Sequence, residues 1–120
     1  MAKVLIVDDS KTSRKILRNM LEEAGHEIIA EAVDGVEGVQ KYKDVKPDIV
    51  TMDITMPVMD GIEAVSEIMK YDGDAKVIMV TAAGQKNNMV DALKKGASDF
   101  IQKPFDSRVI LDIVDKVLEE

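Results

Sequence analysis

The chain has 120 residues, with 23 acidic against 16 basic side chains, a formal net charge of −7 and no cysteine. This length fits one domain, residues 1–120, with an ordinary core that needs no disulfide or structural metal. The acidic charge argues against nucleic acid and anionic membranes as partners, and the missing cysteines exclude disulfides and thiolate metal sites. With one histidine, a metal site would need oxygen ligands, which favour Mg²⁺, Mn²⁺ or Ca²⁺ over Zn²⁺.

The first apolar run, residues 4–7, predicts a short strand covered on both faces. This run is too short for the core of a signal peptide, and no other run approaches the ~20 apolar residues of a membrane span. We therefore expect a cytoplasmic protein that does not insert into a membrane.

Amphipathic helices and short apolar runs alternate along the rest of the chain. Ser10 or Thr12 is expected to cap a first helix that Gly25 ends, with His26 exposed in the following loop. Capping aspartates followed by glutamate three residues later open helices after residues 34 and 60. Further strands are predicted at 28–30, 49–52, 77–80 and 100–101, and further helices around 89–93 and after Asp106 or Ser107.

Five strands that alternate strictly with five helices predict an α/β fold, a doubly wound parallel sheet with helices on both faces. In such sheets, ligands bind beyond the carboxyl ends of the strands, near the point where the strand order reverses. The residues that follow the strands are therefore the candidates for a functional site.

Charged and hydroxyl side chains follow four of the five strands: Asp8 and Asp9 the first, Asp53 the third, Thr81 the fourth and Lys103 the fifth. Three carboxylates at one edge would repel each other unless they shared a cation, and Mg²⁺ is coordinated by such oxygens. Lysine and threonine opposite them can donate hydrogen bonds to phosphate oxygens. A carboxylate beside Mg²⁺ can itself attack phosphorus, so this set predicts covalent phosphoryl acceptance.

Several motifs then occur in the order and spacing of a known family. They are residues 4–9, Asp53 with Met56-Pro57 and Asp60-Gly61, Thr81-Ala82, and Lys103-Pro104-Phe105. Together they span the chain, which resembles the receiver domain of two-component response regulators. The resemblance implies a flavodoxin-like five-stranded sheet in the order 2-1-3-4-5.

The resemblance also implies a role for each matching residue. Asp53 would be the phospho-acceptor, Thr81 the switch hydroxyl and Lys103 the phosphate contact. The metal ligands would be Asp8, Asp9, Asp53 and the backbone carbonyl of Thr55, holding Mg²⁺, with Mn²⁺ as a substitute. Phe100 occupies the position of the switch aromatic, and Ala83 together with Thr55 would influence the rate of phosphate loss.

The function implied is a monomeric, stand-alone phospho-acceptor switch that is not an enzyme, apart from self-phosphorylation by small phosphodonors and slow self-dephosphorylation. Its expected partners are a histidine kinase of the chemotaxis type, the flagellar motor switch protein and a phosphatase. A receiver in another phosphorelay is the alternative. A flavin-binding electron carrier is disfavoured because the loops lack aromatic residues to enclose a flavin. A phosphatase with an aspartate nucleophile is disfavoured because Thr55 stands where its second acid would be.

Overall fold

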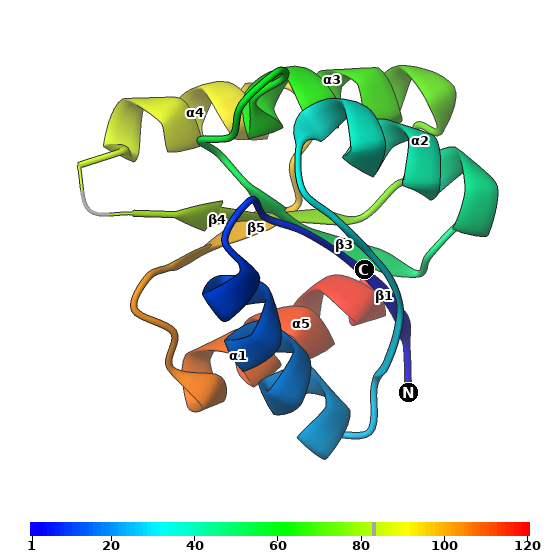
Figure 1. The fold of residues 1–120 in the computed structure, drawn as a ribbon, viewed down its shortest axis with the longest axis vertical. Helices are drawn as coiled ribbons and strands as arrows, with labels where there is room; N and C mark the ends of the chain where they lie inside the picture. Colours follow the sequence, from blue (N-terminus) through cyan, green and yellow to red (C-terminus); the bar gives the residue numbers. More distant parts are fainter. Residues whose placement is uncertain (83) are drawn as a thin grey trace.

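The predicted alternation of strands and helices is confirmed in the computed structural model, which describes residues 1–82 and 84–120 and all their side chains except that of Lys86 (Figure 1). Ala83, expected to influence phosphate loss, lies outside the described residues. The elements are β1 (Lys3–Val7), α1 (Lys11–Glu23), β2 (Glu27–Ala32), α2 (Gly35–Val45), β3 (Ile49–Asp53), α3 (Gly61–Tyr71), β4 (Val77–Thr81), α4 (Lys86–Lys94), β5 (Asp99–Gln102) and α5 (Ser107–Glu119).

The strands form one parallel sheet in the order β2-β1-β3-β4-β5, as expected from the resemblance. The chain starts in β1, adds β2 on one side and then crosses to β3 on the other. The strand order therefore reverses between β1 and β3, whose carboxyl ends carry all three of the predicted acidic residues. Beyond such a reversal, the diverging connections leave room for a ligand.

Helices cover both faces of the sheet (Figure 1): α1 and α5 lie on one face, and α2, α3 and α4 on the other. Each face has its own apolar layer, because successive side chains of a strand point to opposite faces. In β3, for example, Ile49 packs in the layer under α1 and α5, whereas Val50 and Met52 pack under the other helices. None of the described helices is both long enough and apolar enough to cross a membrane.

Helix starts follow the predicted capping chemistry. Ser10, Asp34, Asp60 and Asp106 each accept a hydrogen bond from a backbone N–H in the first turn of the helix that follows. Such bonds satisfy donors that have no partner within the helix. The sequence left two capping residues open, and the structure shows that Ser10 rather than Thr12 caps α1 and that Asp106 rather than Ser107 caps α5.

The prediction of an exposed His26 was wrong, because this side chain is only 9% exposed. Its Nδ1 accepts a hydrogen bond from the backbone N–H of Ala2 at 3.1 Å. Backbone bonds on either side of it, such as Glu27 N–H to the Ala2 carbonyl, close the start of β2 onto the start of β1. His26 therefore secures the N-terminal edge of the sheet, at the end of the strands opposite to the predicted site.

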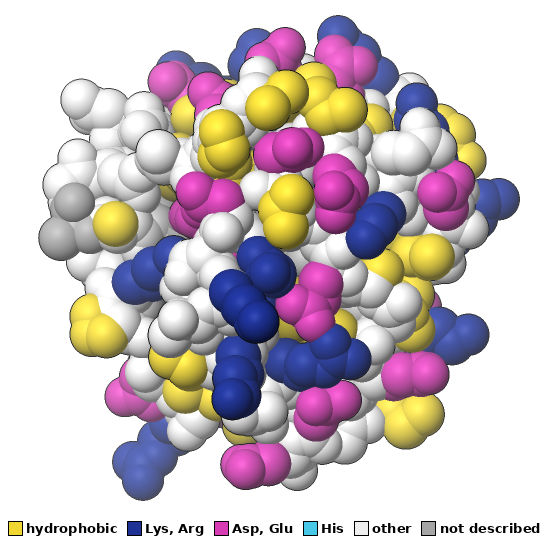
Figure 2. Space-filling view, viewed as in Figure 1, with side chains coloured by type: hydrophobic (Ala, Val, Ile, Leu, Met, Phe, Trp, Pro, Cys, Tyr) yellow, Lys and Arg dark blue, Asp and Glu magenta, His cyan; other side chains and the backbone are white. Residues whose placement is uncertain are grey.

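The outer surface of α1 mixes positive and negative charge (Figure 2). Arg14 and Arg18 both pair with Glu31 of β2, and Arg14 also donates to the backbone carbonyl of Asp8 at 2.7 Å. The ion pairs are partly solvated, so each contributes little to stability. The hydrogen bond from Arg14 to Asp8 holds the start of α1 against the carboxyl end of β1.

Thr51 in the middle of β3 is 1% exposed, and its hydroxyl has no hydrogen-bond partner among the described residues. Its neighbours in the sheet are Ile6 and Ile78, both apolar and buried. An unpaired hydroxyl in such a place costs about 1–3 kcal/mol. We expect Thr51→Val to raise the free energy of unfolding by about 1 kcal/mol in urea denaturation. A loss of stability would show that the hydroxyl is hydrogen-bonded in solution.

Candidate functional site

The structure brings three of the predicted acidic residues together at the carboxyl ends of β1 and β3. Carboxylate oxygens of Asp8, Asp9 and Asp53 all lie within 4.8 Å of one another. Asp8 and Asp53 are buried, and Asp9 is exposed. Three converging carboxylates with one open side fit Mg²⁺, which takes oxygen ligands and keeps several waters.

Lys103 reaches the same place from the connection after β5. Its Nζ lies 3.2 Å from Asp8 Oδ2 and 3.6 Å from Asp53 Oδ2, so one ammonium serves two carboxylates. The backbone N–H of Lys103 donates to the Thr81 carbonyl at 2.8 Å, and a cis peptide bond joins Lys103 to Pro104. The prediction paired Lys103 only with a phosphate, whereas the structure also pairs it directly with the acids.

The electrostatics at Asp53 are unfavourable to its charged form. Burial and then the neighbouring charge of Asp8 raise the pKa of Asp53 from 3.8 to about 6, although Lys103 acts in the opposite direction. Among the protein groups at the site, the single ammonium of Lys103 therefore does not balance the negative charge of the carboxylates. A divalent cation would supply the missing positive charge and favour the ionised, nucleophilic carboxylate.

This raised pKa predicts a pH dependence of stability. The folded protein binds the Asp53 proton more tightly than the unfolded chain, so the carboxylate destabilises the fold increasingly as pH rises from about 4 to above 6. In metal-free buffer at pH 7, we expect Asp53→Asn to raise the free energy of unfolding by about 2 kcal/mol, after allowance for solvent screening. Urea denaturation should show this gain fading as the pH is lowered to 4, and a gain independent of pH would contradict it.

Gly61 allows a close approach that the sequence motif did not explain. A Cβ atom at this position would lie 2.0 Å from the backbone carbonyl oxygen of Asp53, which leaves no room for a side chain. The Gly61 N–H donates to the Ile54 carbonyl at 2.7 Å. The first residue of α3 is thereby packed directly on the backbone that carries Asp53, and it fixes where the carboxylate points.

Thr81 lies at the carboxyl end of β4 and Phe100 lies in β5, the next strand of the sheet. Thr81 is 2% exposed at the end of β4, and its hydroxyl donates to the Ile101 carbonyl at 3.4 Å, a long and weak bond. Phe100 in β5 is half-buried and packs against the apolar layer under α2, α3 and α4.

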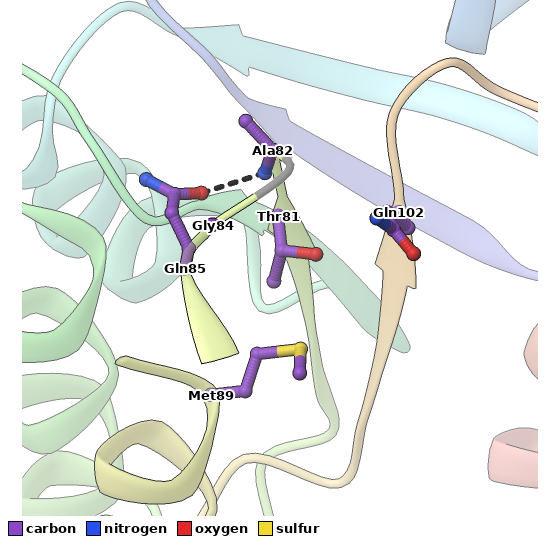
Figure 3. A pocket seen from close by; sticks show the side chains of 6 residues that line it. All are labelled: Thr81, Ala82, Gly84, Gln85, Met89 and Gln102. Atoms are coloured by element: carbon purple, nitrogen blue, oxygen red, sulfur yellow. Dashed lines mark hydrogen bonds between the residues drawn. The ribbon is translucent and has the colours of Figure 1, made fainter. Parts of the chain in front are cut away.

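A cavity of about 220 Å³ opens beside Thr81, between the carboxyl ends of β4 and β5 and the start of α4 (Figure 3). It is lined by Thr81, Ala82, Gly84, Gln85, Met89 and Gln102. Gln85 donates from Nε2 to the Thr55 hydroxyl at 2.5 Å and accepts from the Ala82 N–H at 2.6 Å. Sequence reasoning missed Gln85, since a lone glutamine before a helix carries no motif.

Comparisons with known proteins agree with this geometry. The response regulator receiver domain family matches residues 4–115. Chemotaxis protein CheY of Listeria monocytogenes is 53% identical over 116 residues, which cover 97% of this chain and 98% of that protein. CheY of Thermotoga maritima is 50% identical over 115 residues, which cover 96% of each.

Solved structures give the same result. The crystal structure of the CheX–CheY–BeF₃–Mg²⁺ complex from Borrelia burgdorferi contains a chain with a TM-score of 0.92 and 48% identity, covering 96% of this chain and 87% of that one. The receiver match covers nearly all of the sequence, and the residues at the strand ends converge as the motif requires. The chain therefore belongs to the response regulator receiver domain family.

Proposed function

We propose that this receiver is a stand-alone chemotaxis response regulator that accepts a phosphoryl group on Asp53. The observation that carries the proposal is the meeting of a buried carboxylate with two further acids and one ammonium at the reversal of strand order. The names of relatives that match over nearly their whole length support the chemotaxis assignment and the single-domain organisation. A receiver in another phosphorelay is the alternative.

In the reaction, a carboxylate oxygen of Asp53 attacks phosphorus in the phosphohistidine of a kinase or in a small donor such as acetyl phosphate. A P–O bond to Asp53 forms as the P–N bond to histidine, or the P–O bond to acetate, breaks. The leaving group takes the electron pair, and the product is an acyl phosphate. Lys103 binds an oxygen of the incoming phosphoryl group, a role supported by the 3.6 Å distance between its Nζ and Asp53 Oδ2.

Asp8, Asp9, Asp53 and the Thr55 carbonyl are the proposed ligands of Mg²⁺, and Mn²⁺ substitutes because it accepts the same oxygen ligands. The bound cation would neutralise charge that otherwise accumulates between the acids and the phosphoryl oxygens. The supporting observation is the raised pKa of Asp53, which marks a shortage of positive charge at this edge of the sheet.

Phosphorylation acts as a switch through Thr81 and Phe100. The weakly held Thr81 hydroxyl turns toward the phosphoryl group, and half-buried Phe100 moves inward. The surface of α4, β5 and α5 then changes its affinity for a target, here the flagellar motor switch protein, which is a shift between two packings. A histidine kinase of the chemotaxis type supplies the phosphoryl group, and a phosphatase removes it. The protein acts as a monomer in the cytoplasm.

The proposal is tested by incubating the purified chain with acetyl phosphate and Mg²⁺ and measuring its intact mass. We expect a gain of one phosphoryl group that is lost again slowly on removal of the donor, without sustained turnover. No gain at any Mg²⁺ concentration would refute phosphoryl acceptance.

A further inference from the structure

The side-chain amide of Gln85 joins the ends of β3 and β4 beside Asp53. Its Oε1 accepts from the Ala82 N–H at 2.6 Å (Figure 3), and its Nε2 donates to the Thr55 hydroxyl at 2.5 Å. Gln85 immediately precedes α4, yet its side chain makes no capping bond to that helix. The amide is committed to the two strand ends instead.

The Ala82 N–H points toward β3, as the ladder of the sheet requires. In a parallel strand, alternate residues turn their N–H and C=O groups to opposite neighbours. Val80 faces β3, since its carbonyl accepts from Ile54, and the Thr81 carbonyl faces β5, since it accepts from Lys103. The backbone groups of Ala82 therefore face β3 again, the strand that ends in Asp53. The Ala82 N–H is the first donor after β4 on this side that has no partner in the sheet.

Gln85 replaces the partner that the ladder no longer offers. The Ile54 carbonyl, which would continue the ladder to Ala82, accepts instead from the Gly61 N–H at 2.7 Å. The Gln85 bonds are short, whereas the Thr81 hydroxyl is held only by a 3.4 Å contact. In this state, the Gln85 side chain therefore links the end of β4 to the residues that follow β3.

A phosphoryl group on Asp53 would compete for the same donor. Its charged oxygens accept hydrogen bonds about twice as strong as those accepted by a neutral amide oxygen. We propose that Gln85 is a positioning residue: it stabilises the unphosphorylated arrangement of the β3 and β4 ends and releases the Ala82 N–H when Asp53 is phosphorylated. This inference rests on the proposed function, because it concerns the regulation of the same site.

The test uses beryllium fluoride, which mimics a phosphoryl group on a carboxylate, in saturating Mg²⁺. Gln85→Met keeps the length of the side chain and removes both hydrogen bonds. We expect it to bind beryllium fluoride about five-fold more tightly in calorimetric titration, because bonds specific to the empty state are gone. Gln40→Met, at an exposed position on α2 where the amide bonds Asp44, is the matched control and should leave the affinity unchanged.

Two further measurements separate this role from a merely structural one. Thr55→Val removes the hydroxyl that Gln85 contacts, so Gln85→Met with Thr55→Val should bind no more tightly than Gln85→Met alone. In ¹H–¹⁵N spectra of the wild-type chain, saturation with beryllium fluoride should shift the resonances of the Gln85 side-chain amide, because its oxygen loses the hydrogen bond from the Ala82 N–H.

Unchanged or weaker binding by Gln85→Met, or an unshifted Gln85 amide on saturation, would overturn the inference. A wild-type chain that binds no beryllium fluoride would instead refute the proposed function.

Discussion

Asp53→Asn is expected to gain no phosphoryl group from acetyl phosphate and Mg²⁺, whereas the wild-type chain gains one. The substitution keeps the shape of the side chain but removes the ionised oxygen that attacks phosphorus. Because Asp53 is 7% exposed beside Asp8 and Lys103, a same-sized neutral group should leave the fold intact. Intact mass spectrometry, with circular dichroism as the check of folding, measures both points.

The control is Asp112→Asn at an exposed position on α5, which should still accept one phosphoryl group. A mass gain in Asp53→Asn equal to that of the wild-type chain would place the acceptor elsewhere. Asp8 and Asp9 would then be the remaining carboxylates of the cluster to examine.

The alternation of strands and helices could be predicted from the sequence because the strands are built around short apolar runs and four of the five helices begin with a side-chain cap, α4 being the exception. The order of the sheet came from the family resemblance, since alternation alone does not say where each strand inserts. The convergence of Asp8, Asp9 and Asp53 followed from the rule that parallel strands end at one edge. These predictions rest on backbone geometry, which local patterns largely determine.

The errors and omissions concern side chains whose partners are distant in sequence. His26 was expected in solvent because it follows a helix-ending glycine, yet a backbone donor 24 residues away holds it in place. Gln85 pairs with Thr55 across 30 residues, and nothing in either local pattern announces the contact.

Mg²⁺ is expected to raise the melting temperature of the wild-type chain, by about 5 °C at a concentration some ten times its Kd. The three carboxylates are crowded whether or not a cation is present, so binding relieves repulsion that the fold already contains. Asp9→Ala should largely remove the effect. Asp9 suits this test because it is exposed, so its loss leaves no cavity.

Asp8 would be a poorer choice, because it is 3% exposed and also accepts the Ser10 N–H at the start of α1. The matched control is Asp112→Ala on α5, whose melting temperature should respond to Mg²⁺ as the wild type does. Lowering the pH below 6 should weaken the response of the wild-type chain, because a proton on Asp53 competes with the cation. If Asp9→Ala still responded fully to Mg²⁺, the assignment of these acids as metal ligands would be refuted, while phosphoryl acceptance by Asp53 would stand or fall on its own test.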